Sequence, residues 1–167
     1  KKNVKVDIYL LNGLKINNAK YKIKTLNKYL INFVFLLRYY FNINLNFLLK
    51  NYFKKLCFKN NYDIWHFHSV NYKTLIYINI LSELDQKIIV TLQGADIQID
   101  RQINYGYRLD PKYEQFLRYT FKKVHFFHAI SKNIMQELIK IGVNKDKILI
   151  IPNCSPYDKI KKIQKIK

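Results

Sequence analysis

Short apolar runs and longer amphipathic stretches alternate along this chain, and the alternation predicts strands and helices in turn. Residues 4–11 alternate between apolar and polar positions, as a half-buried strand does. Residues 87–92 form a continuous apolar run, which is typical of a strand buried on both faces of a parallel sheet. Similar runs predict further strands over 62–68, 124–130 and 147–151.

Helical spacing of apolar residues is clearest over 45–57, where asparagines and lysines occupy the opposite side. A denser apolar stretch predicts another helix over 26–41. Further helices are expected over 71–84, 111–122 and 131–141. Ser131 is a typical helix N-cap and Gly142 a typical C′ residue. Loops are expected over 15–25 and 98–110.

This order of elements predicts an α/β fold. We expect a Rossmann-like open, mostly parallel sheet with helices on both faces, because strands and helices alternate along the chain. The length of 167 residues fits one domain, and a composition of 49% hydrophobic residues excludes global disorder. Two cysteines exclude a disulfide scaffold and a four-cysteine zinc site.

The chain carries 30 Lys and Arg against 11 Asp and Glu, a formal net charge of +19. Two explanations remain open. The excess falls on Lys, Asn, Ile, Tyr and Phe, which AT-rich codons specify, or an anionic partner selected it. That partner could equally be an anionic lipid surface or a phosphorylated substrate. A nucleic acid is disfavoured, because only four residues are Arg and most aromatic residues occur at core-like spacing.

The basic helical stretch 20–59 is a candidate for contact with an anionic membrane. Its interfacial aromatics would be Phe33, Phe35, Phe47 and Phe53, beside Lys50, Lys54 and Lys55. The alternative is a core helix with a solvated lysine face. No apolar run approaches the ~20 residues of a membrane-spanning helix, and no signal peptide is recognisable. We therefore expect a cytoplasmic location, peripheral at the inner face of the cell membrane if the helices bind lipid.

Candidate chemistry lies at the carboxyl ends of the predicted strands, where open α/β sheets bind their ligands. His66 and His68 are two residues apart and share one face of a strand. They could contribute to a zinc site, with Asp96 as the nearest acidic candidate, but zinc needs three or four ligands. The alternative is a hydrogen-bonded core histidine at His66 and a rim residue at His68.

The turn over 93–96 follows the most apolar strand. Gly94 permits a positive φ or close approach of the backbone to a ligand, and Asp96 can cap the turn or bind a hydroxyl. The alternative is a plain connection between strand and loop. We expect Gln93, Gly94 and Asp96 to line one crevice with His66, His68 and Ser131. All six are substrate-binding candidates. No residue is assigned as catalytic or as a metal ligand, and no cofactor is expected.

Three common enzyme motifs are absent from the sequence. Neither Gly-x-Gly-x-x-Gly nor a Walker loop occurs, and Gly-x-Ser-x-Gly is missing as well. The motifs present are DIWHFH at 63–68, IVTLQGADI at 89–97, HAISK at 128–132 with IGV at 141–143, and KILIIPN at 147–153. In order and spacing they resemble the N-terminal domain of family-4 glycosyltransferases, which have a two-domain GT-B fold. The resemblance covers 60–155 well and 1–59 loosely.

This resemblance implies a retaining transfer of a sugar from a nucleotide sugar to a glycan or lipid-linked acceptor. It implies an acceptor-side domain over 1–155 and a basic linker over 156–167 that leads to a C-terminal domain beyond the sequence. That second domain would hold the nucleotide-sugar donor and a pair of glutamates, and the family's first strand would precede Lys1. The fragment alone would then be inactive. Gln93 stands where the family usually has His, and Cys154 where it usually has Gly.

Two other functions compete with this one. The first is a basic α/β module that binds nucleic acid or an anionic surface without catalysis. The second is a metal-dependent hydrolase that uses His66 and His68.

Overall fold

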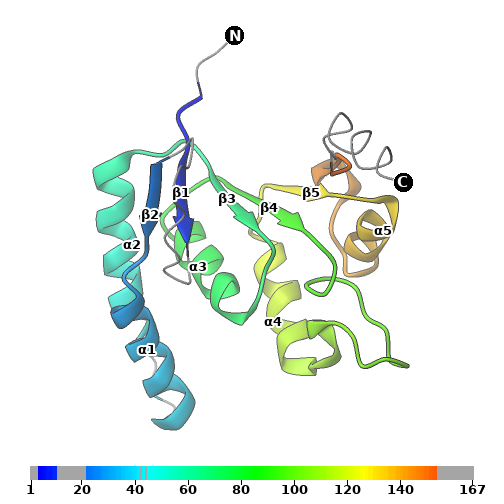
Figure 1. The fold of residues 1–167 in the computed structure, drawn as a ribbon, viewed down its shortest axis with the longest axis horizontal. Helices are drawn as coiled ribbons and strands as arrows, with labels where there is room; N and C mark the ends of the chain where they lie inside the picture. Colours follow the sequence, from blue (N-terminus) through cyan, green and yellow to red (C-terminus); the bar gives the residue numbers. More distant parts are fainter. Residues whose placement is uncertain (1–3, 11–21, 42, 44, 154–167) are drawn as a thin grey trace, which may run out of the picture. The chain divides into compact units, whose positions relative to one another are not determined.

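The structure, a computed structural model, describes residues 4–10, 22–41, 43 and 45–153. The chain divides into two compact units, Lys1–Asn60 and Asn61–Lys167. Figure 1 gives the element labels used below. The expected basic linker over 156–167 and Cys154 lie outside the described residues.

The first unit combines a two-stranded parallel sheet with two helices. Strand β1 (Asp7–Leu10) pairs with β2 (Lys22–Thr25), so that Asp7 lies opposite Lys22. Helices α1 (Lys28–Phe41) and α2 (Asn46–Asn60) follow, as their apolar spacing predicts. The buried residues of this unit are Leu26, Ile31, Val34, Leu49 and Phe53.

Strand β2 corrects the loop expected over 15–25, whose first part lies outside the described residues. Strand β2 itself has only one apolar residue, Ile23, so its own pattern gives a weak strand signal. Its partners supply the rest. Lys24 donates to the Asp7 carboxylate at 2.6 Å and to the Asn60 side chain at 2.8 Å, and backbone pairing with β1 does what local propensity cannot.

The second unit is built on a four-stranded parallel sheet. Its strands are β3 (Trp65–His68), β4 (Ile88–Leu92), β5 (Phe126–Ala129) and β6 (Ile148–Ile150), and they lie side by side in that order. The connecting helices are α3 (Tyr72–Ser82), α4 (Pro111–Phe121) and α5 (Lys132–Lys140). Two 3-10 turns, η1 (Tyr107–Leu109) and η2 (Lys145–Lys147), complete the unit. The predicted α/β class and the parallel sheet are confirmed.

The order of the strands decides where the helices lie. Because each strand is followed by its neighbour in the sheet and parallel crossovers are right-handed, α3, α4 and α5 cover the same face of this sheet, whereas helices on both faces were expected. Figure 1 shows α3 and α4 together on one side of β3 and β4. The side chains on that face include Val90, Leu92 and Phe127, which are completely buried.

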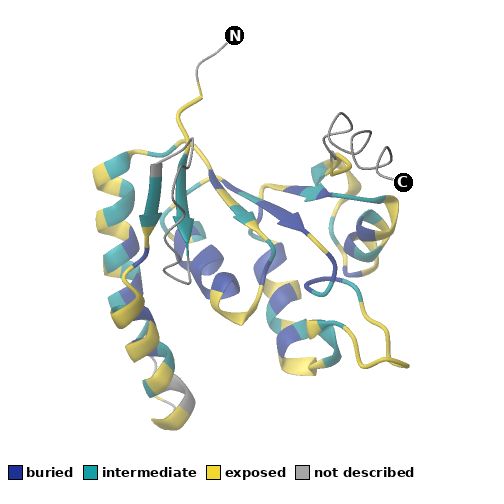
Figure 2. Ribbon diagram, viewed as in Figure 1, coloured by how far each residue is buried: buried dark blue, intermediate teal, exposed yellow. Residues whose placement is uncertain are grey.

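Figure 2 shows how strongly the centre of this unit is buried: β4 and most of α3 carry the buried colour. A polar bridge joins two of the helices within this apolar surrounding. The Asn79 amide donates to Thr120 Oγ1 at 2.6 Å and accepts from Lys123 Nζ at 2.6 Å. Its polar atoms are thereby paired, as burial requires. Among the described residues, no helix is both long and apolar enough to cross a membrane.

Candidate functional site

The carboxylate of Asp96 joins the loops that follow β3 and β4. Its side chain accepts from the backbone N–H of Gly94 at 2.9 Å, of Gln93 at 3.1 Å and of Val70 at 3.3 Å. Asp96 is 1% exposed, so these amides replace the water that its charge would otherwise require. The carboxylate therefore brings two strand ends together, and it faces backbone rather than solvent.

Tyr113 of α4 holds the same junction from the helix side. Its hydroxyl donates to the carbonyl oxygen of Val70 at 3.2 Å, while the amide of Val70 donates to Asp96. Burial, and then the negative charge of Asp96, raise the pKa of Tyr113 above its usual range. The phenol therefore remains a protonated donor at physiological pH.

Gly94 has a φ of +154°, which side-chain-bearing residues rarely adopt. Of the two possibilities that the sequence left open at this glycine, a positive φ or a close approach of the backbone to a ligand, the structure has the positive φ. A Cβ atom at Gly94 would lie 2.8 Å from the Tyr105 hydroxyl, so the loop that contains Tyr105 passes close to the turn. Substitution by valine would disturb the turn itself and is not a clean probe of ligand binding.

The long loop between β4 and α4 is irregular, as predicted, but it is anchored. Asp100 and Tyr105 form an isolated antiparallel bridge, with N–H···O distances of 2.9 and 2.8 Å. Arg108, whose side chain is 6% exposed, binds Glu114 of α4 and donates to Glu137 of α5 at 2.8 Å. Burial disfavours the charged guanidinium, but the hydrogen bonds that it donates to both glutamates, together with their negative charges, outweigh burial and raise the pKa of Arg108.

His66 and His68 share the sheet face opposite to the crossover helices, as their spacing predicts. Their ring centroids are 4.3 Å apart. Both residues are exposed, yet partial burial of the rings is the largest influence on their pKa values. It lowers the pKa of His66 to about 4, helped by the charges of His68 and His128. Burial and His128 also lower the pKa of His68.

Ser131 is the N-cap of α5, as predicted, and its hydroxyl accepts from the amide of Ile134 at 3.3 Å. Ala129 pairs with Leu92, so Ser131 and Gly94 each lie two residues beyond paired positions on neighbouring strands. The side chain of Gln93 is exposed at the same edge.

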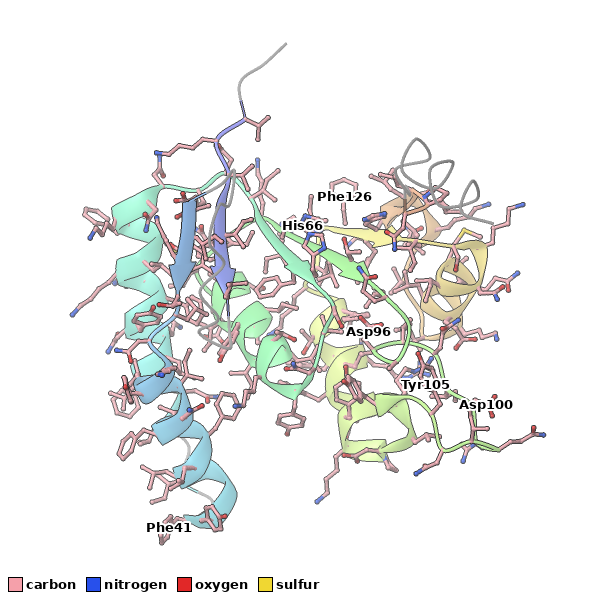
Figure 3. All side chains as sticks on the ribbon, in the orientation of Figure 1. Phe41, His66, Asp96, Asp100, Tyr105 and Phe126 are labelled. Carbon is pink, nitrogen blue, oxygen red and sulfur yellow. The ribbon has the colours of Figure 1, made fainter. Side chains whose placement is uncertain are left out.

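The candidate residues thus fall into two groups. Asp96, Gly94 and Ser131 shape the loops through backbone contacts, whereas His66, His68 and Gln93 are exposed. His66 lies two residues before the end of β3. It is on the open face of the sheet, which is the face opposite to the crossover helices. That all six line one substrate crevice stays a prediction. Figure 3 labels His66 and Asp96 at separate places along the sheet.

Sequence reasoning missed Thr91, His128 and Arg108. Thr91 lies between His66 and His128 on the open face of the sheet and forms a hydrogen bond with each of them. Alternation within the predicted strands would have placed Thr91 and His128 on one face only once the register was known. The structure shows no metal site at His66 and His68. In the described part of the chain, no group of three or more His, Cys, Asp or Glu side chains could hold a metal ion.

We expect Asp96→Asn to destabilise the protein by ~2 kcal/mol, because an amide presents one acceptor atom and a repulsive donor to three backbone N–H groups. Asp100→Asn is the matched control, since Asp100 accepts a single exposed bond from Gln102 at 2.9 Å. Its cost should stay within ~0.5 kcal/mol. Urea unfolding of both variants measures the difference, and equal costs would contradict the role of Asp96.

We expect the pKa of His66 to be about 4, well below the ordinary histidine value of 6.5, because burial and the neighbouring histidines disfavour its charged form. The folded state then binds fewer protons than the unfolded chain between these values, so the free energy of unfolding should fall as pH decreases from 6.5 to 4. The Cε1–H chemical shift of His66, followed by NMR, gives the midpoint. His66→Asn should flatten the pH dependence of stability, and a midpoint at or above 6.5 would refute the expectation.

The comparison with known proteins agrees with the motifs and the fold. The family model described as Glycosyltransferase Family 4 matches residues 2–157. A search of the curated proteins finds no match. The family match spans almost all of the 167 residues and includes both compact units. Together with the Rossmann-like parallel sheet, it establishes that the chain belongs to glycosyltransferase family 4.

Proposed function

We propose that this chain is the acceptor-binding domain of a retaining glycosyltransferase, which moves a sugar from a nucleotide sugar to a glycan or lipid-linked acceptor. The observation that carries the proposal is the edge of the sheet where Asp96 ties the loops after β3 and β4 together. Exposed side chains at and beside this edge, His68 and Gln93, can donate and accept hydrogen bonds. Such uncharged groups suit the hydroxyls of a sugar acceptor.

The donor, in this proposal, is held by a second domain. The family resemblance implies a nucleotide-sugar pocket and two glutamates eight residues apart in that domain. Within this sequence the glutamates are Glu83, Glu114 and Glu137, none of which are eight apart. Arg108 engages two of them in structural ion pairs. The proposed location is cytoplasmic, where nucleotide sugars are available.

The 167-residue chain alone should not turn over nucleotide sugars, because in this proposal the donor is held by the second domain. Release of nucleoside diphosphate from UDP-, GDP- and dTDP-sugars should equal the buffer rate. Robust turnover by the purified chain would sink the proposal. Binding of the acceptor is tested separately by NMR. Saccharides should shift the amide signals of His68, Gln93 and Gly94, and Gln93→Ala should weaken this response. Gln115→Ala, at an exposed position on α4, is the control.

A second function, attachment to an anionic membrane, is favoured by the exposed side chains of the first unit. On α1, Tyr29, Phe33 and Leu36 follow one another at helical spacing and are 78%, 52% and 50% exposed. On α2, Phe47 and Phe58 are exposed, with Lys54 between them on the same side. Phe53, expected at such an interface, is instead buried at 1% exposure, because it packs into the core of this unit.

Apolar and cationic groups on one helical surface suit the boundary between lipid headgroups and acyl chains. Each lysine near an anionic surface is worth ~1 kcal/mol. We expect the chain to co-sediment with vesicles that contain phosphatidylglycerol and much less with pure phosphatidylcholine, and added salt should release it. Phe33→Ser with Tyr29→Ser should weaken binding, whereas Ile103→Ser, at a 72% exposed loop position, should not. Equal binding to both lipids would exclude this function.

A further inference from the structure

A chain of hydrogen bonds runs across the open face of the sheet through three strands. His66 Nε2 lies 2.7 Å from Thr91 Oγ1, and Thr91 Oγ1 lies 2.9 Å from His128 Nδ1. His128 Nε2 lies 2.7 Å from the carbonyl oxygen of Ile151, just beyond β6. Thr91, at 1% exposure, is the buried centre of this chain.

The carbonyl at the far end fixes the direction of every bond. A carbonyl oxygen can only accept, so His128 must carry its proton on Nε2. In a neutral imidazole the other nitrogen is then an acceptor, and Nδ1 of His128 accepts the hydrogen bond that the Thr91 hydroxyl donates. The Thr91 oxygen is left to accept from Nε2–H of His66. His66 is thereby held as the Nε2–H tautomer, and its Nδ1 keeps a lone pair.

That lone pair has no hydrogen-bond partner among the residues that the structure describes. In the described part of the chain, neither Nδ1 of His66 nor either ring nitrogen of His68 makes a hydrogen bond. The titratable groups that act on His66 are His68 on its own strand and His128 on β5. Together with burial they lower the pKa values of His66 and His68, so both rings are neutral at physiological pH. Neutral rings offer hydrogen-bond acceptors and no charge.

We propose that Thr91 and His128 are positioning residues, which lock His66 as the Nε2–H tautomer so that its Nδ1 accepts a hydrogen bond from a hydroxyl of a neutral saccharide. The inference rests on the proposed acceptor-binding function and names the chemistry of one subsite within it. His68, stacked against His66, forms the second wall of that subsite. A phosphate or another anion would meet the Nδ1 lone pair of His66 here and is disfavoured.

The tautomers are measurable without any ligand. Long-range ¹H–¹⁵N correlation spectra at neutral pH should show His66 and His128 each as one tautomer with a protonated Nε2. Thr91→Val removes the hydroxyl with little change of shape, and His66 should then show averaged tautomers while His128 keeps Nε2–H through Ile151. Thr91→Ser restores the hydroxyl and should restore the single tautomer. Averaged tautomers at His66 in the unaltered chain, or no effect of Thr91→Val, would overturn the positioning role.

The ligand is tested with methyl α-glucoside as a neutral probe and inorganic phosphate as the anionic one. The glucoside should shift the Nδ1 resonance of His66, and Thr91→Val should weaken this response ~2- to 10-fold, the loss expected for one neutral hydrogen bond. A response to phosphate alone, or to neither probe, would overturn the saccharide subsite. If Thr91→Val fails to fold by circular dichroism, His128→Phe tests the same link, because it removes the acceptor of the Thr91 hydroxyl.

Failure here and failure of the proposed function are distinguishable. The tautomer measurement needs neither donor nor acceptor, so it can fail while saccharides still shift the amides of Gln93 and Gly94. Conversely, turnover of a nucleotide sugar by the chain alone would end the proposed function and leave the tautomers of His66 and His128 unchanged.

Discussion

The buried carboxylate of Asp96 sets the geometry of the loops at the carboxyl ends of β3 and β4. Asp96 is 1% exposed and accepts from three backbone amides, two in its own turn and one beyond β3. A buried charge without such partners would cost several kcal/mol, so the loops are held where they satisfy it. Tyr113 reinforces the arrangement from α4 by binding the carbonyl oxygen of Val70. Strand ends that sequence alone leaves independent are thereby fixed against one another.

The elements of the fold were predictable because each has a strong local signal. Continuous apolar residues mark β4, an N-cap serine and a C′ glycine bracket α5, and both appear where the pattern places them. Strand β2 was missed because its signal is not local: pairing with β1 and the bond from Lys24 to Asp7 form between segments far apart in the chain. Such contacts depend on register, which a hydrophobic pattern does not specify for a short polar strand.

The candidate site was predictable in position and less so in the roles of its residues. The rule that ligands bind beyond the carboxyl ends of parallel strands selects His68, Gln93 and Gly94 directly. It gives no indication that Asp96 turns into the backbone, or that Arg108 ties a mobile-looking loop sequence to two helices. Thr91 was hidden for another reason: a threonine within an apolar strand resembles an ordinary β-branched core residue until its neighbours across the sheet are known.

The charge of the chain and the chemistry of the open face point in different directions. A net charge of +19 attracts anions to the molecule as a whole, and the lysines of α2 concentrate part of it beside exposed aromatic residues. At His66 and His68, by contrast, burial and repulsion from His128 lower the pKa values and keep the rings neutral. Long-range attraction and short-range selection are therefore separated. In our proposals, the basic surface brings the protein to an anionic lipid layer, while the neutral histidine pair binds a saccharide hydroxyl and not the phosphates that this surface attracts.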